Sequence, residues 1–212
     1  MNCYIFDFDG TLIDSMDMWS RVIYTELDKR GVSYPDDLIK IVTPMGLIKA
    51  YEYVASLDER LSFDEVRDFL DERALYEYSY VIQPKANVIK KLKELKRLGA
   101  SLNVLTACTH QFLDPCLKRV GIYDMFDNVW STDDLGMAKS NPQIFKQVAS
   151  LLKKEPNECL FFDDNIEALR TAKAAGMRAI GVYDETSALY ENEIKAFADG
   201  YIKDFNEIKK PL

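Results

Sequence analysis

The 212-residue sequence lacks several features that define particular classes of protein. No apolar run reaches the roughly 20 residues that a membrane-spanning helix needs, so we expect no contact with a membrane. The first apolar stretch begins at Cys3, which leaves no room for a signal peptide in front of it. Internal repeats and low-complexity segments are also missing. These absences favour a globular chain of one domain, or of one domain with an insert.

Basic residues are in deficit and cysteine is scarce. Lys and Arg number 27 against 35 Asp and Glu, which gives a net charge of −8. A nucleic-acid-binding surface needs a basic face, so this balance argues against a nucleic-acid partner. It leaves an anionic substrate open, because a metal ion and a few local cations can reverse the field inside a pocket. The four cysteines form no CxxC pair, so we expect reduced thiols in a cytoplasmic protein.

One short stretch near the start carries the first chemical signal. The apolar run from Cys3 to Phe6 predicts a buried strand. Asp7 and Asp9 follow it, and their side chains point the same way if the chain stays extended. Gly10 then lets the backbone turn off the sheet. Two converging carboxylates repel each other unless a cation lies between them, and oxygen ligands suit Mg²⁺.

Strands and helices alternate in the second part of the sequence. Apolar runs predict strands at 102–105, 128–131, 159–162, 179–182 and 201–202, with helical patterns between them. This alternation predicts a parallel sheet with helices on both faces, in which ligands bind at the carboxyl ends of the strands. Thr106 and the pair Asp163–Asp164 fall at such ends, as Asp7 does, and Lys139 follows the third strand. A threonine there offers a hydroxyl to a phosphate, although such a threonine is often only a helix cap.

The segment between residues 15 and 80 has a different pattern. It shows no buried strand, and helical spacing begins after Asp14 or Ser15, either of which suits a helix cap. Further helices are predicted at 36–42, 47–55 and 62–78. We therefore expect an α/β core domain made of 1–14 and 81–212, with a helical domain of 15–80 inserted into it.

Four segments together resemble the signatures of the haloacid dehalogenase superfamily. They are the DxDGT stretch that starts at Asp7, the segment Leu105-Thr106-Ala107, the segment from Lys139 to Phe145, and Phe162-Asp163-Asp164-Asn165. Ser140 stands where the family has a proline, Asp163 where many members have a glycine, and Ala168 where those members have a later aspartate. The resemblance covers essentially the whole chain and is nearest to the phosphoglycolate phosphatase and β-phosphoglucomutase branch, which has a helical cap.

The resemblance implies a Rossmann-like core with an α-helical cap and a Mg²⁺-dependent phosphatase that acts on a small phosphorylated metabolite. Asp7 is then the nucleophile that forms an aspartyl-phosphate, and Asp9 is the general acid and base. Thr106 and Lys139 hold the phosphoryl oxygens. The implied phosphate-binding set is Phe8, Asp9, Gly10, Thr106, Ala107 and Lys139. The implied metal-binding set is Asp7, Asp9 through its backbone carbonyl, Asp164, and Asp163 either directly or through a water molecule.

Two alternatives to a phosphatase stay open. Met45, Gly46 and Lys49 lie where relatives place a substrate-contacting cap loop, and Gly46 and Lys49 resemble that loop in β-phosphoglucomutase, which suggests a phosphomutase. Mutase relatives carry a histidine where this chain has Trp19, which favours the phosphatase. A non-catalytic binding protein on the same fold is the other alternative, although such a protein does not need both Asp7 and Asp9. The sequence leaves open the substrate, the oligomeric state, and the roles of His110 and Cys108.

Overall fold

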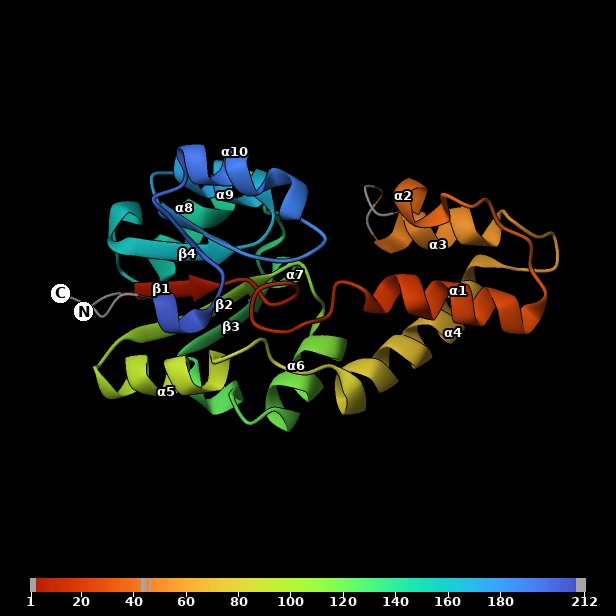
Figure 1. Cartoon of the computed structure of the whole chain (residues 1–212), viewed down its shortest axis with the longest axis horizontal. Helices are drawn as coiled ribbons and strands as arrows, with labels where there is room; N and C mark the ends of the chain where they lie inside the picture. The colour runs from red at the N-terminus through yellow and green to blue at the C-terminus, as the bar shows by residue number, and fades with distance from the viewer. Residues whose placement is uncertain (1–2, 43–44, 46, 209–212) are drawn as a thin grey trace. The chain divides into compact units, whose positions relative to one another are not determined.

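The computed structural model describes residues 3–42, 45 and 47–208 of the chain. The chain forms two compact units, drawn as ribbons in Figure 1. The first unit combines Met1–Met16 with Ile82–Leu212, and the second unit is Asp17–Val81. The chain therefore leaves the first unit soon after its first strand and returns to it at Ile82.

A six-stranded parallel sheet lies in the middle of the first unit, in the order β3-β2-β1-β4-β5-β6. Its strands are β1 (Cys3–Phe6), β2 (Ser101–Thr106), β3 (Asn128–Ser131), β4 (Cys159–Asp163), β5 (Arg178–Val182) and β6 (Gly200–Ile202). The Rossmann-like α/β fold that the alternation of strands and helices predicts is confirmed by this sheet.

The order of the strands changes direction at β1. Phe6 pairs with Val104 of β2 on one side and with Phe162 of β4 on the other. The chain runs outward from β1 to β2 and β3, and then returns to the opposite side of β1 to form β4. The loops that follow β1, β2 and β4 diverge at such a point, and they leave a crevice at the carboxyl edge of the sheet where ligands bind.

Helices cover both faces of the sheet (Figure 1). One face carries α8 (Pro142–Leu151), α9 (Ile166–Ala174) and α10 (Glu191–Phe197), and the other carries α5 (Val88–Arg97) and α6 (His110–Arg119). The remaining short helical segments are α7 (Thr132–Leu135) and 3₁₀ turns at Tyr123–Met125, Pro156–Glu158, Ala188–Tyr190 and Phe205–Glu207.

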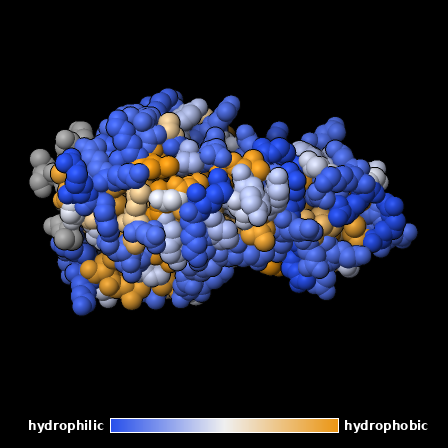
Figure 2. Space-filling model, turned by 90° about the horizontal axis from the view of Figure 1, so that it is seen from below, coloured by the Kyte–Doolittle hydropathy of each residue, from blue (hydrophilic) through white to orange (hydrophobic). Residues whose placement is uncertain are grey.

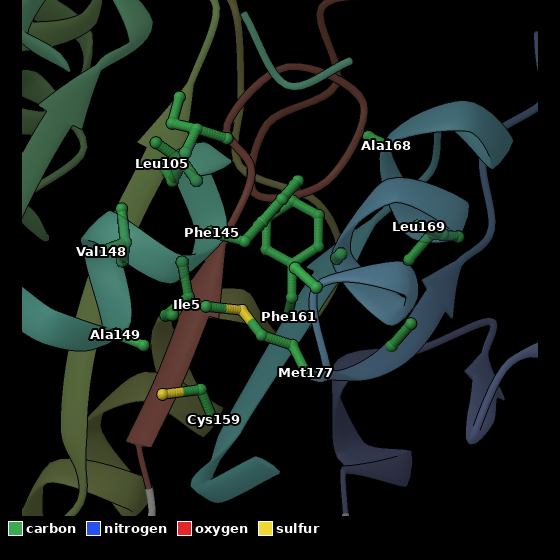
Figure 3. Close-up of a cluster of buried hydrophobic side chains, with 14 of the residues drawn as sticks. Ile5, Leu105, Phe145, Val148, Ala149, Cys159, Phe161, Ala168, Leu169 and Met177 are labelled. Atoms are coloured by element: carbon green, nitrogen blue, oxygen red, sulfur yellow. The ribbon is translucent and has the colours of Figure 1, made fainter. Parts of the chain in front are cut away.

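Figure 3 shows the core between the sheet and the helices α8 and α9. Phe145 of α8 meets Phe161 of β4 edge to face, with ring centroids 4.9 Å apart and planes at 68°. Both side chains are fully buried, and burial of one such side chain stabilises the fold by about 1.5–3 kcal/mol. This packing fixes β4, and with it the position of the acidic residues at its carboxyl end.

The second unit is entirely helical in its described residues. Its helices are α1 (Met18–Arg30), α2 (Leu38–Val42), α3 (Leu47–Ala55), α4 (Phe63–Tyr76) and a π-helix (Glu77–Val81). Ser62 and Glu65 form the capping box that the sequence predicts at the start of α4. The predicted cap of α1 is wrong: the helix begins at Met18, after Asp17, and Ser15 donates its hydroxyl hydrogen to Asp9 instead.

Hydrophilic residues predominate on the face of the molecule drawn in Figure 2, and hydrophobic residues form separate patches there. Among the residues that the structure describes, the most exposed large hydrophobic ones are Leu189 and Tyr80, at 75% and 70%. Among the described residues, no helix combines the length and the apolar character that crossing a membrane requires.

Candidate active site

Most of the residues that the sequence places at the carboxyl ends of strands meet at one pocket of the first unit, although Asp163 is not among the residues that line it. This pocket has a volume of about 270 Å³. Its lining residues are Asp7, Asp9, Met16, Thr106, Ala107, Cys108, Lys139, Asp164, Asn165 and Ala168. They come from the loop after β1, the end of β2 with the turn that follows it, the connection between α7 and α8, and the segment that leads from β4 into α9. Segments far apart in the sequence therefore converge at the crevice beside β1.

The loop after β1 places the two aspartates differently. The chain does not stay extended beyond Asp7, because the carbonyl of Phe8 accepts hydrogen bonds from the N–H groups of Thr11, Leu12 and Ile13. Asp7 is buried, and its N–H donates to the carbonyl of Phe162 at 2.8 Å. Asp9 is half-buried. Both aspartates nevertheless line the same pocket.

Gly10 allows this loop to approach the end of β4. Its φ of +72° lies in the left-handed region that favours glycine. A Cβ atom at this position would lie 2.7 Å from Oδ1 of Asp164, which is closer than carbon and oxygen can pack. The neighbouring hydroxyl of Thr11 donates to the same oxygen at 3.3 Å. Both residues therefore hold Asp164 against the loop that carries Asp7.

Three carboxylates form a buried acidic cluster in the first unit: Asp7, Asp163 and Asp164 each place an oxygen within 4.8 Å of the others. Their exposed fractions are 5%, 0% and 4%. Nζ of Lys139 lies 2.7 Å from Oδ1 of Asp7 and 2.7 Å from Oδ2 of Asp163, and its side chain is 13% exposed. If all four groups are ionised, three negative charges face one positive charge, and two remain uncompensated.

The pKa shifts in this cluster arise first from burial and then from the charges of the neighbouring groups. Burial raises the pKa of Asp163 to about 7, although the charge of Lys139 opposes the shift. Burial also raises the pKa of Asp164 well above its usual range, and the charges of Asp163 and Asp7 add to the effect. Burial acts to lower the pKa of Lys139, but the charges of Asp163 and Asp7 outweigh it and hold that pKa above its usual value.

Thr106 ends β2 and is almost fully buried. Its hydroxyl oxygen accepts a hydrogen bond from the N–H of Cys108 at 3.0 Å, which folds residues 106–108 into a turn along the pocket. Helix α6 begins only at His110, with Thr109 before it. Thr106 is therefore not the cap of this helix, and its hydroxyl can still donate a hydrogen.

Lys139 is held by the short connection between α7 and α8. Gly136 ends α7 in a left-handed conformation with a φ of 63°. Asn141 caps α8 by accepting a hydrogen bond from the N–H of Gln143 at 3.0 Å, and Pro142 occupies the first turn. The lysine thus lies between two fixed helix ends, and the connection follows β3 as the sequence predicts.

Several residues of the site carried no sequence signal. The hydroxyl of Ser15 donates to Oδ1 of Asp9 at 2.6 Å, although the sequence suggests only a helix cap there. Lys85 and Asp184 form an ion pair of 2.7 Å near the same edge of the sheet, and both are largely buried. Asp184 lies close enough for its charge to contribute to the raised pKa of Asp164. A contact between residues so far apart in sequence has no local pattern that could reveal it.

The remaining candidates lie as follows. Lys49 is exposed on α3, and Met45 is half-buried just before that helix, whereas Gly46 lies outside the described residues. Their predicted role in substrate recognition stays a prediction. Cys108 lines the pocket, and His110 contacts two aspartates. Ala168, at the position of the family's later aspartate, also lines the pocket.

The acidic residues thus surround a lysine at the carboxyl edge of a parallel sheet, the place where open α/β folds bind their ligands. The chain belongs to the haloacid dehalogenase-like hydrolase family, whose model matches residues 1–176. The predicted family and the predicted class of enzyme are confirmed by this match.

Two curated relatives cover most of the chain. One is validoxylamine A 7′-phosphate phosphatase of Streptomyces hygroscopicus subsp. limoneus, 26% identical over 212 residues, with 98% of this chain and 95% of that protein covered. The other is pyrophosphatase PpaX of Bacillus velezensis, 28% identical over 185 residues, with 84% and 81% covered.

Solved structures share the fold of the whole chain. A variant of CbbY from Rhodobacter sphaeroides in complex with xylulose-1,5-bisphosphate has a TM-score of 0.81 at 20% identity, with 99% and 97% of the two chains covered. A β-phosphoglucomutase from Clostridium difficile has a TM-score of 0.70 at 19% identity, with 99% and 93% covered. At these identities the likeness shows the fold alone.

Proposed function

We propose that this protein is a Mg²⁺-dependent phosphatase that hydrolyses a small phosphorylated metabolite through an aspartyl-phosphate on Asp7. The observation that carries this proposal is the contact of Lys139 with Asp7 inside a cluster of three buried carboxylates. The class of enzyme, a phosphoric monoester hydrolase of the haloacid dehalogenase type, is supported by the family match and by the phosphatases among the relatives.

The acidic cluster fits a divalent cation. Its donors are all carboxylate oxygens, which are the ligands that Mg²⁺ prefers, and its uncompensated charge equals that of one Mg²⁺. Asp7 and Asp164 would hold the ion through their carboxylates, Asp9 through its backbone carbonyl, and Asp163 either directly or through a water molecule. When bound, Mg²⁺ withdraws charge from the phosphoryl group and reduces its repulsion by Asp7.

Three residues of the pocket have separate roles in the transfer of the phosphoryl group. The Asp7 carboxylate attacks the phosphorus atom and displaces the alcohol, which leaves an acyl phosphate on Asp7. The Lys139 ammonium, which lies 2.7 Å from the Asp7 carboxylate, holds the oxygens of the transferred group. The Thr106 hydroxyl lines the pocket and donates to another phosphoryl oxygen.

Asp9 moves the protons. It donates a proton to the oxygen of the leaving alcohol, and it later removes a proton from the water that hydrolyses the acyl phosphate. This role suits a carboxylate that lines the pocket but lies outside the buried acidic cluster. The hydroxyl of Ser15 orients Asp9 by its hydrogen bond of 2.6 Å.

Backbone N–H groups around the pocket complete the phosphate site in this proposal. Asp9 and Ala107 line the pocket and stay predicted donors, and Phe8, which does not line it, also stays only a prediction. The N–H of Gly10 donates to the carbonyl of Ile13 at 3.1 Å within the loop. We therefore assign to Gly10 the close approach of Asp164, rather than a hydrogen bond to phosphate.

The second unit is proposed as the cap that recognises the leaving group, with Met45, Gly46 and Lys49 as contact residues. The relative that hydrolyses a phosphorylated small molecule supports a metabolite as the substrate. A phosphomutase is the second candidate, favoured by the fold that the chain shares with a β-phosphoglucomutase. Trp19 on α1 disfavours it, because that position carries the mutase histidine.

A cytoplasmic location belongs to the same proposal. All four cysteines are free thiols in the structure, which is the state that a reducing compartment maintains. The predicted absence of a nucleic-acid surface rests on the net charge of −8 and stays part of this proposal.

A substrate screen tests the proposal. The purified protein is assayed for phosphate release from sugar phosphates, nucleotides and phosphoglycolate, with Mg²⁺ present or removed by a chelator. We expect hydrolysis of at least one small phosphate ester, dependence on Mg²⁺, and inhibition by excess Ca²⁺, whose more flexible ligand shell spoils the geometry of attack. Full turnover after exhaustive chelation would contradict the metal assignment. Interconversion of phosphate positions on one sugar, without release of phosphate, would instead establish the mutase.

A further inference from the structure

His110 is the only histidine of the chain, and it lies between two carboxylates. Its Nδ1 is 2.8 Å from Oδ1 of Asp114, one turn along α6. Its Nε2 is 2.8 Å from Oδ2 of Asp134, which belongs to α7. The ring thus connects the start of α6 to α7. The connection is partly exposed, since the side chains of His110 and Asp134 are each 40% exposed.

The protonation state follows from this geometry. A neutral imidazole has one N–H group and one lone-pair nitrogen, so it can donate to only one carboxylate. Both ring nitrogens lie at hydrogen-bond distance from carboxylate oxygens, and only an imidazolium can donate to both. Both hydrogen bonds, that with Asp114 more than that with Asp134, accordingly raise the pKa of His110 above its usual value, although burial opposes the shift.

The two segments that the ring connects both carry residues of the candidate site. His110 directly follows the turn at 106–109, which begins with Thr106. Asp134 lies just before the connection that carries Lys139. Thr106 and Ser131 are register partners at the ends of β2 and β3, and the N–H of Ser131 donates to the same Asp134 oxygen that His110 contacts. The bridge therefore extends the pairing of β2 and β3 beyond the edge of the sheet.

We propose that the protonated His110 is a positioning residue that holds the Thr106 turn and the Lys139 connection together, so that phosphate binding weakens when the ring loses its proton. This inference rests on the proposed function, because it assigns both segments to the phosphate site. His110 does not line the pocket, and it acts through Thr106 and Lys139.

The direction of the pH dependence follows from the raised pKa. The bridge is complete below that pKa and contributes its full stabilisation there, and it is lost as pH rises through the pKa of the folded state. The charged groups that face the ring are Asp114 from α6 and Asp134 from α7. Lys118, one turn further along α6, contacts the other Asp114 oxygen at 3.7 Å, and Asp133 adjoins Asp134 on α7.

The test uses the ring itself as the first probe. Proton NMR of the intact protein follows the single imidazole through a pH titration, with no need for activity. We expect a pKa above the ordinary histidine value, and a lower pKa in Asp134→Asn. A ring that titrates at the ordinary value in the wild-type protein overturns the proposal.

The second measurement compares kcat/KM for an aryl phosphate between the wild type and His110→Gln at several pH values. We expect the wild type to exceed the variant roughly two- to fivefold below the measured pKa, with the difference lost above it, as suits a partly exposed ion pair. The effect should lie mostly in KM. A ratio that is constant across pH contradicts the inference even if the enzyme is active.

Asp114→Asn is the matched control. The neutral ring can then donate from Nε2 to Asp134 and accept at Nδ1 from the new amide, so the contact between the segments no longer needs a proton. At low pH we expect this variant to have the kcat/KM of the wild type, and at high pH we expect it to keep that value. A loss of kcat/KM at high pH like that of the wild type contradicts the inference.

If no phosphate ester is hydrolysed, the proposed function fails. The shift in melting temperature caused by inorganic phosphate, measured across pH in the same variants, then decides the role of His110.

Discussion

Buried carboxylates occur in both units of the molecule, but their partners differ. In the second unit Glu77 is contacted by Arg21 at 3.2 Å and Arg73 at 2.6 Å. Glu26 there is contacted by Lys29 and Arg30. Each of these two carboxylates has two cations. In the first unit, three buried carboxylates share the single cation of Lys139.

The pKa shifts differ in the same way. Burial acts to raise the pKa of Glu26, but its hydrogen bonds with Lys29 and Arg30 outweigh burial and hold that pKa below its usual range. Burial prevails at Asp163, whose pKa rises to about 7. A carboxylate that only supports the fold is neutralised by its neighbours, whereas the acidic cluster lacks positive charge in a way that a divalent cation corrects.

The largest expected effect separates two aspartates of the first unit. Asp7→Asn removes the nucleophile and should lower turnover by at least about 10⁴-fold, with any leaving group. Asp9→Asn removes the proton donor, and with an alkoxide leaving group the loss should be about 10²–10⁴-fold. With p-nitrophenolate, which needs little protonation, the first step should survive. Rapid-mixing measurements of the first turnover with both kinds of substrate measure the difference, because the slow second step limits the steady-state turnover of Asp9→Asn. Equal losses for the two variants on p-nitrophenyl phosphate would contradict the separate roles.

The next prediction tests the charge comparison itself. Asp164→Asn relieves repulsion in the acidic cluster and should raise the metal-free free energy of unfolding by about 1–2 kcal/mol. The gain should grow with pH. Folding raises the pKa of the Asp164 carboxyl, so the wild-type protein becomes less stable as pH rises through that pKa, whereas Asp164→Asn does not. The same variant should lose the stabilisation that added Mg²⁺ gives to the wild type.

Glu77→Gln is its counterpart in the second unit. It leaves Arg21 and Arg73 without their charged partner and should lower the free energy of unfolding by about 1–3 kcal/mol, with no change in the response to Mg²⁺. Chemical denaturation measures the free energy of unfolding of each of the two variants, with and without Mg²⁺. If Asp164→Asn and Glu77→Gln change metal-free stability in the same direction, the comparison between the units is wrong.

A further change in stability is expected at the buried ion pair that adjoins the acidic cluster. Lys85→Met leaves Asp184 charged, buried and without its ammonium, which should cost about 2–3 kcal/mol of stability. The double variant Lys85→Met with Asp184→Asn should recover part of that loss, because it also removes a negative charge near Asp164. Thermal unfolding of the single and double variants gives the comparison. A double variant less stable than Lys85→Met would show that Asp184 supports the fold independently of Lys85.

The smallest effect concerns the exposed Lys49 on α3. Lys49→Ala should raise KM for the true substrate and leave turnover of a generic aryl phosphate nearly unchanged, since recognition of the leaving group is uniform binding. Exposed Lys40 on α2 supplies a control, Lys40→Ala, that should change neither constant. Loss of turnover on both substrates would assign Lys49 another role.

Much of the fold follows from local pattern. The sequence predicts β1, β3 and α3 with the bounds that the structure shows, because each has an apolar pattern with a clear end. It misses α7, whose four residues are too few to show a period, and it ends the predicted helix 62–78 inside the π-helix Glu77–Val81. It misplaces the start of α1 because Ser15, a good helix cap, bonds to Asp9 instead.

The candidate site was accessible from sequence for a different reason. Asp7, Thr106 and the pair Asp163–Asp164 end parallel strands, and topology brings such ends to one edge of the sheet. The contacts that orient these residues were not accessible. The bonds from Thr11 to Asp164 and from Lys85 to Asp184 join residues 153 and 99 positions apart, and no local rule pairs them.

The most direct test of the proposed chemistry is a search for the acyl phosphate on Asp7. In Asp9→Asn, p-nitrophenyl phosphate should phosphorylate the protein faster than water can release the phosphate. A rapid-mixing experiment should then show a burst of nitrophenolate, and mass spectrometry of the quenched protein should place one phosphoryl group on Asp7, only when Mg²⁺ is present. A phosphoryl group on any other residue, or a burst from Asp7→Asn, would contradict the account.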